Sequence, residues 1–136
     1  MSLFVPENAR QEIKFVTFHA NRYRIMQWLQ FHYAGFSLAY PERWVNNIYF
    51  DSNGYHSFED NISGTSSRAK IRYRWYGDLQ ALASGALEVK RKRNFFGWKL
   101  TFPVCAGPNL NTDSWEKIKN HLREQISQEG QSWLIS

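Results

Sequence analysis

The chain has 136 residues, of which 43% are hydrophobic and 17% aromatic. This composition excludes a disordered polymer and is typical of one globular domain, which we expect to span residues 1–136. The sequence shows neither an apolar run near the ~18 residues of a membrane span nor a secretion signal. Cys105 is the single cysteine and the four histidines lack the spacing of a zinc site, so a reducing, cytoplasmic location is the simplest expectation. The net charge of +5 indicates an anionic partner.

The first half of the chain predicts two strands and one helix. Alternation with β-branched and aromatic residues predicts a strand over residues 10–18, and the spacing of apolar residues predicts a helix over 20–36. A second strand is expected at 45–52. Residues 53–67 are rich in Ser, Asn and Gly, which is typical of a loop, with a short helical turn expected around 57–62.

The second half predicts three more strands and a helix. We expect strands at 69–77, 85–93 and 97–104, with a hairpin at the tight connection 94–97. For the helix that follows, Asp113 is the expected N-cap, and the apolar stripe consists of Trp115, Ile118, Leu122 and Ile126. The order β-α-β-β-β-β-α indicates an α+β fold with an antiparallel sheet.

One alternation class of these strands carries most of the positive charge. In "KIRYRWY", Lys70, Arg72 and Arg74 occupy every second position, so a strand would present them on one face and Ile71 with Tyr73 on the other. The corresponding positions of the other strands bring the set to eight cations and two anions, a net of +6 against +5 for the whole chain. The cations are Arg10, Lys14, Lys70, Arg72, Arg74, Lys90, Lys92 and Lys99, and the anions are Glu12 and Glu88.

This charge pattern suggests a phosphate-rich ligand. Like charges on neighbouring strands destabilise a sheet unless an anion offsets their repulsion, and arginine forks suit phosphate oxygens. A solvated sheet face with clustered cations is the alternative. Nucleic acid is a less favoured ligand, because Tyr73, Trp75 and Trp98 alternate away from the charged face, which we expect to offer only Tyr76 for base stacking.

With these residues identified, the chain resembles a VTC domain, the polyphosphate polymerase domain of the vacuolar transporter chaperone family in the triphosphate tunnel (CYTH-like) superfamily. The segments "RQEIKF", "VNNIYFDS", "SRAKIRYRWYG" and "LEVKRKR…GWK" carry the resemblance, in order and spacing. They correspond to the amino-terminal half of such a domain. The resemblance implies an antiparallel sheet with a cationic concave face, half of a β-barrel tunnel, flanked by helices.

The resemblance also implies ATP or polyphosphate as ligand and metal-dependent phosphoryl transfer, with Mn²⁺ or Mg²⁺. Lys14, Arg72, Arg74 and Lys90 match residues with catalytic roles, and Lys99 matches a lysine of the next strand. All eight cations of the charged face are then candidate phosphate ligands.

Two departures from the family pattern limit what this chain is expected to do alone. Hydrolytic members of the superfamily open with a Glu-x-Glu-x-Lys pattern, whereas here Arg10 stands first and leaves Glu12 as the candidate metal ligand. Glu12 and Glu88 could instead orient neighbouring lysines. The tunnel also needs further strands, so we expect a second chain or a carboxyl-terminal half to complete it, and membrane association only through a partner. The alternative function is a non-catalytic module that binds polyphosphate or another polyanion.

Overall fold

The computed structural model describes residues 5–79 and 84–134. The chain divides into two compact units, one formed by residues up to 12 together with residues from 43 onward, and the other by residues 13–42. The larger unit contains the sheet and most helices, and the smaller unit contains one α-helix and one short 3-10 helix.

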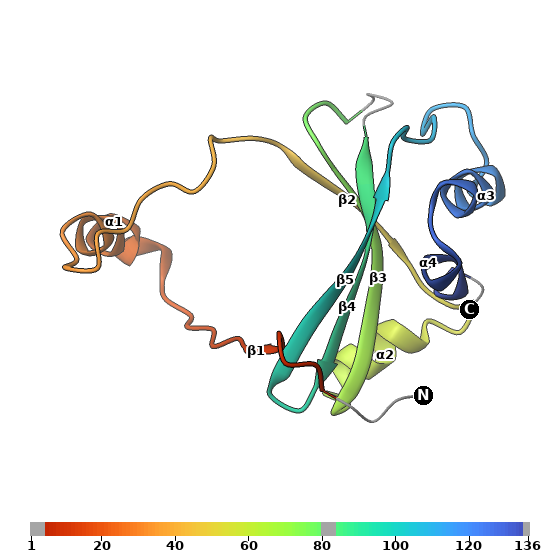
Figure 1. Cartoon of the computed structure of the whole chain (residues 1–136). Coiled ribbons are helices and arrows are strands. Elements are labelled where there is room, and N and C mark those ends of the chain that lie inside the picture. The colour runs from red at the N-terminus through yellow and green to blue at the C-terminus, as the bar shows by residue number, and fades with distance from the viewer. Residues whose placement is uncertain (1–4, 80–83, 135–136) are drawn as a thin grey trace. The chain divides into compact units, whose positions relative to one another are not determined.

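The larger unit is built on a five-stranded antiparallel sheet with the order β1-β5-β4-β3-β2 (Figure 1). The strands are β1 (Arg10–Gln11), β2 (Val45–Phe50), β3 (Ser67–Tyr76), β4 (Gly85–Arg93) and β5 (Phe96–Val104). The sheet is open, with β1 and β2 at its edges. These elements confirm the expected α+β class with an antiparallel sheet, although the barrel is not closed.

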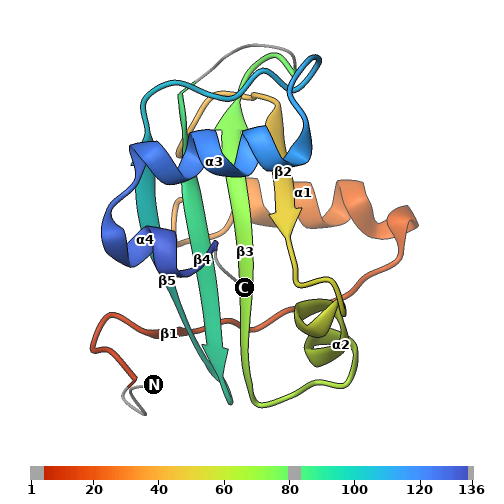
Figure 2. The same ribbon diagram turned by 90° about the vertical axis from the view of Figure 1, so that its right-hand side faces the viewer.

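The hydrophobic core lies on one face of this sheet. Tyr73 and Trp75 of β3 and Leu87 and Val89 of β4 are at most 2% exposed, as period-two alternation requires of a half-buried sheet. Helices α3 (Trp115–Gln125) and α4 (Gln128–Ser132) cover the same face (Figure 2). Three of the four residues of the expected helical stripe are buried there: Ile118, Leu122 and Ile126.

The β4–β5 connection is the hairpin expected from the sequence. Arg93 pairs with Phe96, so Asn94 and Phe95 form a two-residue loop. Asn94 has a φ of 53°, in the left-handed region that asparagine tolerates better than most residues. This tight turn fixes the register of the two strands and therefore which side chains share a face.

Helix α2 (His56–Ile62) confirms the short helical turn expected within the 53–67 segment. The Asp51 carboxylate accepts hydrogen bonds from the backbone N–H groups of Ser57 at 2.9 Å and Phe58 at 3.0 Å. These bonds satisfy N–H groups that the first turn of a helix leaves without partners.

The smaller unit contains η1 (His19–Asn21) and α1 (Arg22–Gln30), neither of which has a buried residue. The helix is shorter than the expected 20–36, because the chain leaves helical geometry after Gln30 and reaches Gly35 with a φ of 62°. His32 makes ring contacts there with Trp28, Tyr33 and Phe36.

Two further boundary predictions are wrong. The strand expected at 10–18 is limited to Arg10–Gln11, whose partners on β5 are Gly97 and Phe96. The N-cap of α3 is Ser114 rather than Asp113, because the Ser114 hydroxyl accepts the Lys117 N–H at 3.3 Å. The Asp113 carboxylate instead accepts the Asn109 N–H at 3.0 Å and pairs with the Lys117 ammonium at 2.6 Å.

Candidate functional site: a basic sheet face around Glu88

The sheet face opposite the core carries rows of charged side chains that run across three strands. Antiparallel pairing sets Lys70 opposite Lys90 and Lys90 opposite Lys99, so three lysines from β3, β4 and β5 share one row. The neighbouring row contains Arg72 opposite Glu88. We call this set, together with Arg74 and Lys92 in the adjacent rows, the basic face: Lys70, Arg72, Arg74, Glu88, Lys90, Lys92 and Lys99.

Glu88 lies at the centre of the basic face and is 4% exposed. Its Oε2 accepts hydrogen bonds from Arg72 Nε at 2.8 Å and Arg72 Nη2 at 2.6 Å. Its Oε1 accepts one from Lys99 Nζ at 2.6 Å, and Arg74 Nη1 lies 3.8 Å from Oε2. One buried carboxylate therefore joins cations from the strands on both sides of β4, as a buried charge requires.

These contacts shift the pKa values of Glu88 and Arg72. Burial would raise the pKa of Glu88, but the hydrogen bonds from Lys99 and Arg72 outweigh it and hold the pKa below its usual value. Burial would likewise lower the pKa of Arg72, yet its bonds to Tyr49 and Glu88 raise it overall. At neutral pH Glu88 is therefore negative and Arg72 positive.

Strand β2 contributes two polar side chains that the sequence analysis missed. Asn47 Oδ1 accepts a hydrogen bond from Arg74 Nε at 2.8 Å, and the Tyr49 hydroxyl accepts one from Arg72 Nη1 at 3.3 Å. Asn47 and Tyr49 lie opposite Arg74 and Arg72 in the β2–β3 register. Alternation along "VNNIYF" puts these two on a common face, but the register that aligns them with the arginines cannot be read from that strand alone.

Tyr49 corrects the expectation that Tyr76 is the only aromatic residue on the charged face. The Tyr49 side chain is on the same face as Arg72 and is 58% exposed. Tyr76 is 42% exposed, and the Arg43 guanidinium lies 3.9 Å from the centre of its ring. Two aromatic rings thus border the cations, so this face disfavours nucleic acid less strongly than the strand pattern indicated.

The residues expected from the first strand separate into two groups. Arg10 pairs with Gly97, and the Glu12 carboxylate lies 3.0 Å from the Lys90 ammonium, so these two belong to the edge of the basic face. Lys14 belongs to the smaller unit. Its convergence with the other cations therefore stays a prediction.

The described residues contain no cluster of three metal-ligating side chains. No group of three or more His, Cys, Asp or Glu side chains comes together within residues 5–79 and 84–134. Glu12, the candidate ligand, is hydrogen-bonded to Lys90. Mg²⁺ is usually held by one or two carboxylates together with substrate phosphates, so the role of Glu12 as a metal ligand stays a prediction.

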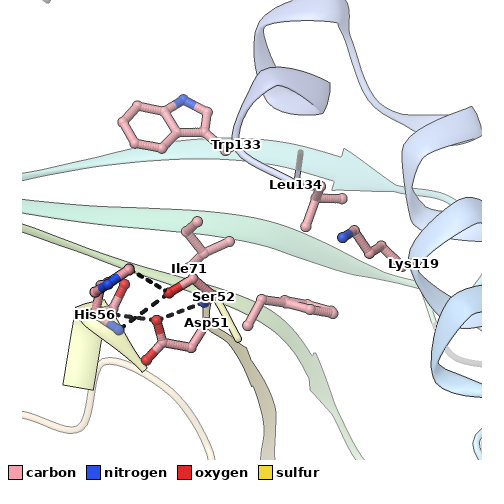
Figure 3. Close-up of a pocket in the computed structure, with 9 residues that line it drawn as sticks. Asp51, Ser52, His56, Ile71, Lys119, Trp133 and Leu134 are labelled. Carbon is pink, nitrogen blue, oxygen red and sulfur yellow. Dashed lines mark hydrogen bonds between the residues drawn. The ribbon is translucent and has the colours of Figure 1, made fainter. Parts of the chain in front are cut away.

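A separate pocket lies on the core side, between α2 and the two carboxyl-terminal helices (Figure 3). Its polar edge contains Ser52, whose hydroxyl is 2.9 Å from His56 Nδ1, and Asp51, which caps α2. Lys119, Trp133 and Leu134 line other parts of the pocket. Because Asp51 and Ser52 are engaged in ordering the start of α2, this pocket is a feature of the fold rather than the candidate site.

Comparison with known families identifies the class of this fold. The family model described as the VTC domain matches residues 9–132, so the chain belongs to the VTC-domain family. The match confirms the resemblance found in the sequence. No curated protein and no solved structure matches the chain.

Among the helices of the described residues, none has the length and apolar content of a transmembrane segment.

Proposed function

We propose that this chain binds the phosphates of ATP or polyphosphate on the basic face and serves phosphoryl transfer as part of a polyphosphate polymerase-type domain. The observation that carries the proposal is the row of Lys70, Lys90 and Lys99 beside the Arg72–Glu88 row. Glu12 and Glu88 offset Lys90 and Lys99, and a chain of phosphates would offset the positive charge that remains on the face. Membership of the VTC-domain family supports the same ligand class.

The chemistry of the cations fits this role. Phosphoryl transfer depends mainly on positioning and on neutralising the charge of phosphate oxygens. Arg72 and Arg74 supply planar guanidinium groups that can form two bonds to one phosphate, and the lysines supply point charges along the chain. Mn²⁺ or Mg²⁺ bound with the phosphates would supply further neutralising charge, and Glu12 is the candidate ligand from this chain.

The alternative is a module that binds polyphosphate or another polyanion without catalysis. One observation favours it: Glu12 and Glu88, the carboxylates at this site, are both engaged by cations of the face. A binding module needs only the cations, whereas transfer needs further groups. The two candidate functions share the same ligand and differ in whether a phosphoryl group is transferred.

Isothermal titration calorimetry of the full chain tests the shared ligand. We expect affinity to follow phosphate number, so that tripolyphosphate competes with ATP and single-stranded DNA competes poorly at physiological salt. DNA binding more tightly than tripolyphosphate would overturn the proposal and point to the rings of Tyr49 and Tyr76.

Matched variants separate the site from net charge. The double substitution Arg72→Ala/Arg74→Ala should lower tripolyphosphate affinity at least about tenfold, since each charged hydrogen bond contributes roughly 1.5–3 kcal/mol. Lys117→Ala/Arg123→Ala on α3 removes the same charge from the opposite side of the sheet and should change affinity less than about twofold. An equal loss of affinity in both double variants would mean that binding depends on the net charge of the protein and not on the basic face.

A further inference from the structure

We infer that Glu88 is a positioning residue of the basic face: it holds Arg72 and Lys99 from opposite sides of β4 so that their remaining N–H groups address one phosphate. This inference rests on the proposed function. It adds to the site an anionic residue that does not itself bind phosphate.

The geometry gives Glu88 a separate contact to each neighbouring strand. Oε2 engages Arg72 of β3 through two N–H groups, and Oε1 engages Lys99 of β5 through one. Both carboxylate oxygens are thus occupied, and neither cation needs to move for the other to be held. A carboxylate on the middle strand can bridge both neighbours in this way because its side chain lies between theirs on one sheet face.

The exposed fractions of the side chains show that Glu88 lies deeper in the face than the three cations around it. The Glu88 side chain is 6% exposed, whereas those of Arg72, Arg74 and Lys99 are 16%, 23% and 42% exposed. The carboxylate therefore lies beneath the cationic ends, and a ligand that approaches the face meets N–H groups first. This arrangement differs from that of an exposed anion, which would repel phosphate directly.

The donors are only partly consumed by Glu88. Arg72 uses Nε and Nη2 toward the carboxylate and Nη1 toward Tyr49. A guanidinium has five N–H groups and an ammonium three, so hydrogens remain on Arg72 and Lys99 for a ligand. Three cations around one carboxylate also leave a local charge of +2, from Arg72, Arg74, Lys99 and Glu88.

Replacing the carboxylate should therefore have two opposite effects. Glu88→Gln adds one net positive charge to the face, which strengthens long-range attraction for an anion. It also removes the charge that holds Arg72 and Lys99 in place, so their direct contacts to phosphate weaken. Salt separates the two effects, because it screens long-range attraction far more than short contacts.

The test is tripolyphosphate binding by the full chain across a salt series. Between about 0.05 M and about 0.5 M NaCl, where the screening length falls severalfold, Glu88→Gln should change from about threefold tighter than wild type to about threefold weaker. Tighter binding at every salt concentration would make Glu88 a simple repulsive charge. Weaker binding at every concentration would make its role structural. Either result overturns the inference.

Two carboxylates serve as controls. Glu12→Gln makes the same charge change on the same face from a side chain that is 53% exposed, and its binding curve should approach the wild-type curve at high salt without crossing it. Glu124→Gln on the exposed side of α3 should leave the curve unchanged. A crossing in Glu12→Gln as well would show that the effect is not specific to the buried position.

A second measurement keeps the inference testable if Glu88→Gln fails to fold. In ¹⁵N-labelled wild type, the Arg72 Nε–H resonance should be resolved without ligand and should persist when tripolyphosphate saturates the protein, because its partner remains Glu88. Loss of that resonance on binding would show that phosphate replaces Glu88, which overturns the inference. Absence of tripolyphosphate binding by wild type would overturn the proposed function as well, so the two failures are distinguishable.

Discussion

Arg91 is a cation on β4 that belongs to the core side of the sheet rather than to the basic face. Alternation sets it with Leu87 and Val89, and its guanidinium carbon lies 5.3 Å from the Trp98 ring centre and 5.4 Å from that of Trp133. These distances are within the range of cation–π attraction. Its neighbour in sequence, Lys92, lies on the opposite face. Adjacent cations of the run "KRKR" thus have different roles.

We therefore expect Arg91→Ala to separate stability from binding. Loss of two ring contacts and of the packed aliphatic stem should lower the free energy of unfolding by about 1–2 kcal/mol. Tripolyphosphate affinity should stay within about twofold of wild type, because this side chain faces away from the basic face. Urea unfolding and calorimetry measure the two quantities. A variant with wild-type stability and impaired binding would contradict the assignment.

The lowered pKa of Glu88 makes the free energy of unfolding depend on pH. Burial opposes ionisation of Glu88, but Lys99 and Arg72 outweigh it and leave its pKa in the folded state below the ordinary value of 4.5. A lowered carboxyl pKa contributes stability that is fully present above the unfolded-state pKa and is lost as pH falls through the folded-state pKa.

Glu88→Gln should accordingly be less stable than wild type at pH 7, by about 2 kcal/mol, because the bonds of Arg72 and Lys99 to a carboxylate become bonds to a neutral amide. The difference between the two proteins should shrink as the pH falls below 4.5 and through the lower folded-state pKa of Glu88, where folded wild type takes up the proton. Urea unfolding at a series of pH values measures it. A difference that stays constant down to the acid limit of folding would show that Glu88 does not titrate as described.

At the scale of elements, α4 is placed on the sheet by a glycine. Gly130 is buried, and a methyl group at its Cα would lie 2.9 Å from Cγ of Phe102 on β5. That separation is closer than packed carbon atoms tolerate. The helix approaches the strand as it does because this residue has no side chain.

Gly130→Ala should therefore destabilise the protein although alanine is the better helix former. The usual gain of about 1 kcal/mol is outweighed by overpacking, which costs about 1–3 kcal/mol. Gln128→Ala, at an exposed position of the same helix, should change stability by less than about 0.5 kcal/mol. Thermal unfolding measures both. Equal or greater stability of Gly130→Ala would mean that α4 can shift away from Phe102.

The elements also show why some features could be predicted and others could not. The three central strands follow from alternation alone, since Ile71, Tyr73 and Trp75 are all buried as the pattern requires. Residues 10–18 show a similar pattern, yet only Arg10 and Gln11 pair with another strand. Strand propensity is local, whereas a strand exists only where a partner offers its backbone.

Some contacts of the candidate site could also be predicted from the sequence, and others could not. Its cations on β3, β4 and β5 are visible in the sequence, because each strand shows its own alternation. The contacts of Asn47 and Tyr49 depend on the β2–β3 register, and those of Glu88 depend on its central place between two strands. Both are properties of strand pairing, which lies beyond any single segment.

At the scale of the whole molecule, the sheet is open, and this should limit catalysis. Lys90 and Lys99 have side chains that are 46% and 42% exposed, so their contacts with phosphate are made in water, where charge interactions are weak. We expect residues 1–136 to form polyphosphate from ATP near the background rate. A partner that encloses the basic face should raise the rate.

The measurement is polyphosphate formed from ATP in the presence of Mn²⁺, with and without such a partner. In the enclosed protein, Arg72→Ala/Arg74→Ala should abolish synthesis, and Lys117→Ala/Arg123→Ala should retain it. Robust synthesis by this chain alone would refute the prediction that the open face cannot support transfer.

The outer edge of β5 has a consequence for how the protein behaves at high concentration. Strand β1 pairs with β5 at Gly97 and Phe96, and no other described strand continues that pairing toward Val104. Exposed backbone of this kind recruits strands from other molecules and starts aggregation. Pro103 interrupts the edge, since proline has no N–H to donate. Replacing Pro103 with valine should make concentrated solutions turbid over hours, while dilute samples keep the wild-type circular dichroism spectrum.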